Sequence, residues 1–318
     1  DFEGKSGKKV KVAWNGGYIL NPELVGKLGI DENFIGSPLG LLINESQIKS
    51  PPLFNKVALL IDKQGHAHID HVNLQAGLTI IFPDDSVLLL SSKQRNKILK
   101  NEASFFDLFS KKEYSIKGFI AYRFVGNKII EKIEEQENLC ILPIGITLCV
   151  PRGSQWDNYS AGDEVTFSIP SLEEYVESVE AGPLLVKNGR QAINMEKEGW
   201  TTDFSSATQA ARLDYINMRG PKLGVGITSS GEIIIVAING RIRESVGATH
   251  DELANILIDE GCMEAMGFDP GGSVTLLVDG KQLNISPYNP NYEDNIYSLD
   301  PTPRKVGSAV FVLKDEKD

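Results

Sequence analysis

Short runs of apolar residues, many of them β-branched or aromatic, recur along the chain and are separated by Gly, Pro, Asn and Asp. Runs of this length, bounded by turn-forming residues, are typical of β-strands. The pattern predicts strands over residues 9–14, 39–43, 56–61, 78–82, 87–90, 119–124, 141–150, 164–169, 183–186, 223–228, 232–238, 274–278 and 309–313. We therefore expect a chain built mainly from sheets.

Helical spacing of apolar residues is less common. The clearest helix is expected over 250–261, where Thr249 and Glu252 form a capping box and Gly261 can end the helix. Residues 93–111 and 203–216 also carry apolar side chains at roughly helical spacing, which predicts two further helices.

Two other segments are less well defined by their pattern. Ser171 and Glu174 have the spacing of a capping box and predict a helix start. The highly charged residues 127–138 fit either a helix or one arm of a hairpin. No repeat and no Pro/Gly/Ser-rich linker interrupts the chain, so we expect an α+β fold: mixed, largely antiparallel sheets with a few flanking helices, in a single compact domain over residues 1–318.

Charge and composition narrow the classes of function. The chain has 32 basic and 43 acidic residues in 318, a net charge of −11. A field of this sign repels polyphosphates, so neither nucleic acid nor an anionic membrane is an expected partner. The longest apolar runs are much shorter than the roughly 18 residues that a membrane helix needs, so no integral membrane segment is expected. Three cysteines without a CxxC pair give no disulfide framework.

One motif has the spacing of metal ligands. His66, His68, Asp70 and His71 spell H-x-H-x-D-H, which is typical of zinc hydrolases of the metallo-β-lactamase type. The alternative is a β-hairpin that turns at residues 63–65, with His66, His68 and Asp70 on one face of its second strand. His250 is the one histidine that follows this cluster. A metal-dependent hydrolase remains one candidate, and any cofactor or metal requirement stays open.

The C-terminal third of the chain combines glycine-rich turns with polar residues at the ends of strands. Gly271 and Gly272 can bring backbone N–H groups close to an anion. Asp269, after an apolar run, would direct a carboxylate into the same space. A tight turn without a ligand would have the same local sequence.

The order of these elements resembles the phosphodiester glycosidase family over residues 11–313. The matching elements, in chain order, are Asn15-Gly16-Gly17-Tyr18, residues 38–42, the Gly-Pro-Leu-Leu-Val element at 182–189, residues 221–226, Asn239-Gly240-Arg241, residues 245–254 and Asp269–Ser273. At four positions the chain departs from the family pattern: Lys222 stands for Arg, Leu223 for Thr, Asn239 for Asp and Pro270 for Gly.

The resemblance implies a hydrolase that cleaves the bond between an anomeric carbon and a phosphodiester oxygen in a glycan or envelope polymer. Arg241 and Lys222 would hold the phosphate, and Asp269 would act at the anomeric carbon. Asn15, Gly16, Gly271, Gly272 and Ser273 would contact the substrate. We expect Asn15, Lys222, Arg241 and Asp269 to converge on one cleft.

The departures leave a second function open, in which the chain binds a glycan or phosphorylated glycan without turnover. Lys222 keeps the charge of Arg but lacks its fork, and Pro270 has no N–H. No export signal is visible in the sequence, but the chain starts at Asp1 rather than Met, so an upstream export signal could have been removed. We expect a protein that is secreted or located in the periplasm or cell envelope.

Overall fold

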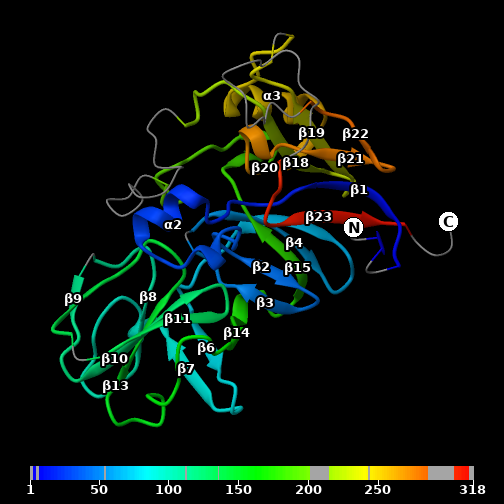
Figure 1. The fold of residues 1–318 in the computed structure, drawn as a ribbon. Coiled ribbons are helices and arrows are strands. Elements are labelled where there is room, and N and C mark those ends of the chain that lie inside the picture. Colours follow the sequence, from blue (N-terminus) through cyan, green and yellow to red (C-terminus); the bar gives the residue numbers. More distant parts are fainter. Residues whose placement is uncertain are drawn as a thin grey trace. The chain divides into compact units, whose positions relative to one another are not determined.

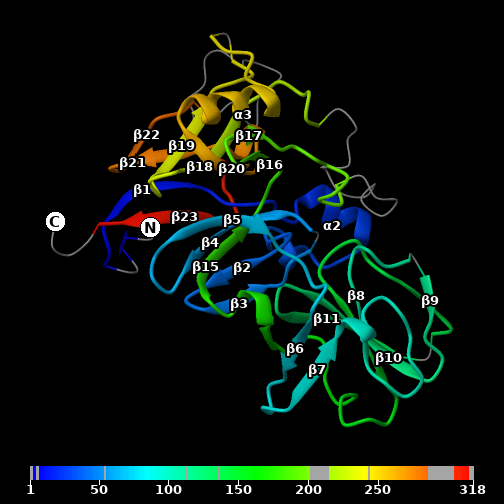
Figure 2. The ribbon, with the colours of Figure 1, turned by 180° about the vertical axis from the view of Figure 1, so that it is seen from behind.

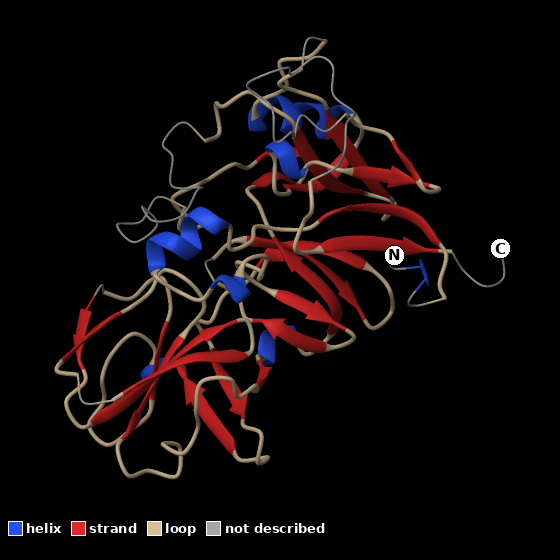
Figure 3. Cartoon of the chain, in the orientation of Figure 1, coloured by secondary structure: helices blue, strands red, loops and turns tan. Residues whose placement is uncertain are grey.

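A computed structural model describes residues 3–4, 7–53, 55–111, 113–134, 136–200, 215–242, 244–285 and 304–314 (Figures 1 and 3). Contacts divide the chain into two compact units. Unit 1 contains residues 1–19, 181–193 and 214–318, and unit 2 contains residues 20–180 and 194–213.

Unit 1 is built on two antiparallel sheets. The first has the order β22 (Lys281–Gln282), β21 (Leu276–Val278), β1 (Val10–Asn15) and β23 (Ala309–Leu313). The second has the order β17 (Arg190–Gln191), β16 (Leu184–Lys187), β20 (Cys262–Gly267), β18 (Lys222–Thr228) and β19 (Ile233–Ile238). The two views from opposite sides place these strands beside helix α3 (His250–Asp259) (Figures 1 and 2).

Helix α3 covers one face of the five-stranded sheet. Thr249 caps it, and both hydrogen bonds of the Thr249–Glu252 capping box are present, so the expected helix start is confirmed. Its apolar side packs Leu253, Ala254 and Leu257 into a core that includes Leu185 and Ala265. A Cβ on Gly224 of β18 would lie 2.9 Å from Leu257 Cδ1, so this glycine lets helix and strand approach closely.

Unit 2 contains an eight-stranded antiparallel sheet. Its order is β5 (Ala67–His71), β4 (Val57–Asp62), β15 (Tyr175–Glu180), β2 (Leu42–Asn44), β3 (Gln47–Ser50), β14 (Thr166–Ser168), β6 (Gly77–Ile81) and β7 (Val87–Ser91). A four-stranded sheet has the order β11 (Lys128–Ile133), β10 (Phe119–Val125), β13 (Thr147–Pro151) and β8 (Ser104–Phe106).

The smaller elements of unit 2 complete the fold. Strands β12 (Asn138–Cys140) and β9 (Glu113–Ser115) form a two-stranded sheet, and helix α2 spans Pro22–Leu28. Short 3₁₀ turns cover Glu32–Phe34, Ser92–Gln94 and Pro170–Leu172; a further one in unit 1 covers Gly271–Ser273. One large core joins residues of both larger sheets, with Leu60, Ile80, Phe105, Tyr122 and Phe167 among its buried members.

The largely antiparallel sheets that the sequence predicts are confirmed, although the fold is richer in β-structure than a balanced α+β protein. Residues 127–138 contribute β11, which is the arm of a hairpin with β10. The turn at residues 63–65 joins β4 to β5, with Leu60 opposite His68, so the predicted hairpin is confirmed.

Two of the predicted helices are wrong. Residues 93–111 form a 3₁₀ turn and strand β8, because Phe105 and Phe106 are both fully buried and pair with Leu148 and Thr147 of β13. After Ser171 the chain enters β15 rather than a helix. The helix predicted over 203–216 falls largely outside the described residues.

Helix α2 was not predicted, although its local signals are clear. Asn21 caps it by accepting a hydrogen bond from Leu24 N, Pro22 occupies the first turn, and Gly29 ends it in the left-handed conformation. Its apolar stripe is too short for a periodicity argument, and Leu24 and Val25 alone are fully buried.

Candidate functional site

The candidate site residues in and around the glycine-rich turns all belong to unit 1, where Gly240 and Gly247 let backbone segments meet. A Cβ on Gly247 would lie 2.3 Å from the carbonyl oxygen of Gly220, and a Cβ on Gly240 would lie 2.6 Å from Pro221 N. Side chains at these positions would collide with backbone, so the glycines are needed for this close approach. Arg241 directly follows Gly240 in this turn and itself has a φ of +55°.

Arg241 is exposed, and its guanidinium lies over two glycines. A Cβ on Gly220 would be 3.2 Å from Arg241 Nε, and a Cβ on Gly271 would be 3.3 Å from Arg241 Nη1. Within the part of the chain that the structure describes, Arg241 has no hydrogen-bond or ion-pair partner. Its five N–H donors are therefore available to an anion.

Lys222 is the first residue of β18 and is 4% exposed. Its Nζ donates a hydrogen bond of 2.9 Å to Met218 O. Burial and the nearby charge of Arg241 lower the pKa of Lys222 to about 8, against the opposite influence of Glu252. Lys222 and Arg241 thus form a local positive centre on a chain of negative net charge.

Asp269 follows β20, and the neighbouring Phe268 N donates to Leu223 O of β18. The carboxyl group is half-buried. Burial raises the pKa of Asp269 to about 6, while a hydrogen bond from Ser273 and the charge of Arg304 act in the opposite direction. This group can exist in either protonation state near neutral pH.

Asn15 and Gly16 hold the loop that carries Asp269 in position. Asn15 Nδ2 donates to Asp269 O at 2.9 Å, and Asn15 Oδ1 accepts from Thr275 N at 3.1 Å. A Cβ on Gly16 would lie 2.2 Å from Ser308 Oγ, so Gly16 allows the chain before β23 to pass close by. In this arrangement Asn15 positions Asp269 through backbone contacts.

The amide of Gly271 is also engaged. It donates to Pro221 O at 3.0 Å, and Gly271 adopts a φ of +74°. Pro270 contributes no N–H. Ser273 is 3% exposed and contacts Asp269. The loop therefore offers less amide hydrogen bonding to an anion than its sequence suggests.

Four further residues lie near Asp269 and Lys222 and were not predicted as site residues from the sequence. Tyr18 OH donates to Gly182 O at 3.1 Å and contacts Tyr215 OH. The ring of Tyr215 packs on His250, with ring centroids 4.9 Å apart. Arg304 acts on the charge of Asp269. Tyr18 directly follows the Asn-Gly-Gly turn, and this position was the one sequence signal that could have indicated a site role.

His250 is 1% exposed, and within the described part of the chain neither of its ring nitrogens has a hydrogen-bond partner. Burial, together with the charge of Lys222, lowers the pKa of His250 to about 3. The imidazole is therefore neutral at physiological pH.

The histidine motif of unit 2 does not form a metal centre. His66 Nδ1 and His68 Nε2 both contact Asp62 Oδ2, at 3.2 and 3.0 Å, whereas His71 Nε2 lies 3.5 Å from Glu198 Oε1. No group of three His, Cys, Asp or Glu side chains among the described residues is arranged to hold a metal ion.

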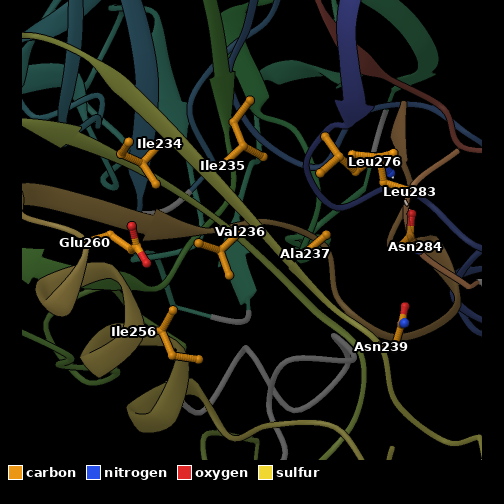
Figure 4. Close-up of a pocket in the computed structure, with 10 residues that line it drawn as sticks. All are labelled: Ile234, Ile235, Val236, Ala237, Asn239, Ile256, Glu260, Leu276, Leu283 and Asn284. Carbon is orange, nitrogen blue, oxygen red and sulfur yellow. Dashed lines mark hydrogen bonds between the residues drawn. The ribbon is translucent and has the colours of Figure 1, made fainter. Parts of the chain in front are cut away.

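A separate hollow of about 430 Å³ in unit 1 lies along β19, the edge strand of its sheet (Figure 4). It is lined by Ile234, Ile235, Val236, Ala237, Asn239, Ile256, Glu260, Leu276, Leu283 and Asn284. None of the sequence-predicted site residues belongs to this lining. In the described part of the chain, no helix has the length and apolar character needed to span a bilayer.

Comparison with known families finds that the phosphodiester glycosidase model matches residues 95–313 of this chain. The matched range includes Lys222, Arg241 and Asp269 and extends from unit 2 into unit 1.

Three individual proteins illustrate the similarity. An uncharacterized SPbeta prophage-derived protein, YomE of Bacillus subtilis (strain 168), is 33% identical over 69 residues, which are 22% of this chain and 11% of that protein. A protein of Burkholderia pseudomallei K96243 that is named as exported has a TM-score of 0.55 at 17% identity, over 98% of this chain and 66% of that one.

A hypothetical protein from Synechocystis has a TM-score of 0.50 at 20% identity, over 87% of this chain and 49% of that one. The chain thus spans less than two thirds of each of these relatives. At these identities the two structures support the fold.

Proposed function

Because this chain belongs to the phosphodiester glycosidase family, we propose that it is a hydrolase that cleaves a sugar-1-phosphodiester at the bond between the anomeric carbon and the phosphate oxygen. The proposed substrate is a glycan or an envelope polymer that contains this linkage. The acting domain is the whole chain, residues 1–318.

One observation carries this proposal beyond family membership: the guanidinium of Arg241, which has no partner among the described residues, lies against Gly271, two residues after the half-buried carboxyl group of Asp269. A phosphate held by Arg241 would therefore lie in the neighbourhood of Asp269. Lys222 adds a second positive charge close to Arg241. Fixed cations next to the departing group stabilise the negative charge that develops on it.

The proposed reaction needs a base more than an acid. Water attacks the anomeric carbon, the carbon–oxygen bond to phosphate breaks, and its electron pair leaves with the phosphate oxygen. Asp269 takes the proton of the attacking water. A phosphate monoester is a good leaving group, so Arg241 and Lys222 would take the place of the acid of ordinary glycosidases. The raised pKa of Asp269, about 6, makes it a stronger base than an exposed aspartate.

Substituting Arg241 and Asp269 one at a time distinguishes phosphate binding from catalysis. Arg241→Ala should weaken transition-state stabilisation by about 2–4 kcal/mol, measured as kcat/KM on a panel of methyl phosphodiesters of sugar-1-phosphates. Asp269→Asn keeps the shape and removes the charge, so it should abolish turnover and leave binding largely intact. Arg190→Ala, an exposed arginine on β17 of the same unit, is the matched control. Unchanged cleavage in both site variants would contradict these roles.

A second candidate function, binding of phosphorylated glycan without turnover, is favoured by one feature of the loop. The Gly271 amide donates to Pro221 O, and Pro270 has no amide proton, so the loop holds an anion less firmly. Binding of the panel by the parent chain without any cleavage would support this function. Lys222→Arg should then raise affinity, because the bidentate fork suits phosphate.

The proposed location is secreted or periplasmic. It is supported by the glycan or envelope substrate that we propose and by the structural similarity to a protein named as exported.

A further inference from the structure

The outer edge of strand β19 (Ile233–Ile238) faces the hollow of unit 1. β19 is the last strand of its sheet, and its pairing with β18 on the inner edge is continuous, without a bulge. Among the described residues, no strand pairs with the outer edge. The strand reads Ile-Ile-Ile-Val-Ala-Ile and lacks the charge, proline or bulge by which natural proteins usually protect an edge. The edge can therefore accept another strand.

The hydrogen bonds of β18 indicate which backbone groups of β19 point outward. Leu223 of β18 lies opposite Ala237 of β19, but its carbonyl oxygen accepts from Phe268 N, at the end of β20. The Leu223–Ala237 pair is therefore one that exchanges no hydrogen bonds, and such pairs recur at every second residue of an antiparallel ladder. Ala237 and Ile235 consequently direct their N–H and C=O groups toward the open edge.

The hollow extends around this edge and is apolar on both faces of the sheet (Figure 4). On one face, Ile234 and Val236 pack toward the core that α3 covers, and Ile256 of α3 lines the hollow. On the other side of the strand, the lining consists of Leu276 and Leu283. Successive side chains of a strand point to alternate faces, so a strand added here would contact an apolar wall on each face.

Glu260 gives the hollow a negative charge. It is the one charged residue of the lining, it is exposed, and it has no ion-pair partner in the part of the chain that the structure describes. Glu260 directly follows α3, which has no basic residue in its last turn, so the negative end of the helix dipole acts in the same direction. The chain also has a net charge of −11, which attracts a cationic segment and repels a second copy.

We infer that β19 is a docking edge for an extended peptide segment of a partner protein. The segment extends the five-stranded sheet in the antiparallel direction that all pairings of this sheet share. It carries apolar side chains at alternate positions and a Lys or Arg next to Glu260. Main-chain hydrogen bonds supply affinity, and the side-chain contacts supply selectivity. The inference uses neither Arg241 nor Asp269, so it does not depend on the proposed function.

The charge requirement is tested with a pair of peptides and a pair of variants. The probe is the acetylated and amidated peptide Lys-Thr-Val-Thr-Val-Thr-Lys, which presents a lysine to Glu260 whichever end lies there, and its matched peptide has glutamate at both ends. Calorimetry gives the Kd of each peptide for the parent, Glu260→Lys and Asp259→Lys. Asp259 is exposed, neighbours Glu260 and lies outside the lining, so it controls for the same change of charge.

The parent should bind the lysine peptide about 5-fold more tightly than the glutamate peptide, the upper range for one exposed ion pair. Glu260→Lys should reverse this preference, and Asp259→Lys should retain it. The inference is overturned if both variants behave alike or if the parent binds neither peptide.

Backbone pairing is tested by removing N–H groups from one edge of the peptide at a time. In an antiparallel pair, the peptide residues bonded to Ile235 and Ala237 share the face of those side chains, whereas the lysines lie on the face of Glu260. The threonine amides therefore meet β19. N-methylation of the threonines should weaken binding by about 10-fold, and N-methylation of the valines should leave it largely unchanged. Equal effects of the two modifications would exclude strand addition.

Ala237→Pro removes one outward N–H and no bond to β18, a change that edge strands tolerate. It should weaken binding of the unmodified lysine peptide, with circular dichroism to verify that the fold is retained. A second copy is the competing occupant, and sedimentation of the parent distinguishes it. A dimer that Ala237→Pro converts to a monomer would assign the edge to self-association and overturn the inference, whereas a monomeric parent that binds the lysine peptide supports it.

Discussion

At the scale of single residues, the environment of Asp269 makes its charge costly to the folded state. The carboxyl group is half-buried, and burial outweighs the hydrogen bond from Ser273 and the charge of Arg304, so its pKa rises to about 6. In the unfolded chain the same group ionises near its ordinary value of about 3.9. Functional groups are often kept in such unfavourable surroundings because reactivity requires it.

Asp269→Asn should therefore stabilise the protein at neutral pH. Between pH 4 and pH 6 the folded state holds the Asp269 proton and the unfolded state does not, so the parent loses stability as the pH rises through this window. The variant lacks this loss and should be more stable by about 1–2 kcal/mol at pH 8, after allowance for partial exposure. Urea unfolding of both proteins at pH 8 and pH 4 measures the effect. A stabilisation of equal size at both pH values would contradict a contribution from ionisation.

Arg241 and Asn15 differ in how many of their hydrogen-bonding groups are left for a ligand. Arg241 is exposed and unpartnered among the described residues, as a ligand-binding group should be. The Asn15 side chain, in contrast, is occupied by Thr275 N and by the carbonyl oxygens of Gly16 and Asp269. Both belong to the family pattern, and only their contacts distinguish a binding role from a positioning role.

At the scale of elements, helix α3 depends on its first turn. Thr249 accepts from Glu252 N, and Glu252 accepts from Thr249 N, so two otherwise unsatisfied amides are bonded. Glu252 is also paired with Arg219. These contacts support a capping role for Glu252, and they fix the end of the helix at which buried His250 meets Tyr215.

Thr249→Ala should destabilise unit 1 by about 1 kcal/mol, the usual cost of losing an N-cap. The free energy of unfolding from urea titration, followed by circular dichroism, measures it. Thr249→Ser retains the oxygen and should restore most of the loss. Equal destabilisation by both substitutions would mean that the methyl group, and not the cap, is responsible.

At the scale of the whole molecule, each compact unit is assembled from separated stretches of chain. Residues 20–180 of unit 2 stand between the first two stretches of unit 1, and residues 194–213 stand between its last two. Unit 1 therefore cannot close until loops of this length are closed, and a folded unit 2 lowers the entropy cost of closing them. Neither unit is a continuous piece that a single cut would release.

We expect residues 1–318 to unfold in one cooperative transition. Tryptophan fluorescence reports on Trp14 in unit 1 and on Trp156 and Trp200 in unit 2, so variants that keep one unit's tryptophans follow each unit separately. The two urea curves should coincide with each other and with circular dichroism. Distinct midpoints, or two stable fragments after limited proteolysis, would show that the units fold independently.

The sequence alone determined the type of structure and the identity of the family. Alternating and β-branched runs predict antiparallel strands because side-chain period and backbone preference are local properties, and the Thr249 cap is likewise visible within four residues. The order of the Asn15, Gly182, Arg241 and Asp269 elements indicated the phosphodiester glycosidase family, which the match over residues 95–313 bears out.

Only the tertiary structure decided which partner each group takes. Residues 93–111 carry helical spacing, but Phe105 and Phe106 find burial on a strand beside β13, and burial of two aromatic side chains outweighs a weak helical pattern. The Gly271 amide donates to Pro221 O, 50 residues earlier in the sequence, and the hydroxyl group of Tyr215 is in hydrogen-bond contact with that of Tyr18. These hydrogen bonds join residues far apart in the chain, so no local pattern can specify them, yet they help to arrange the backbone and side chains around Asp269.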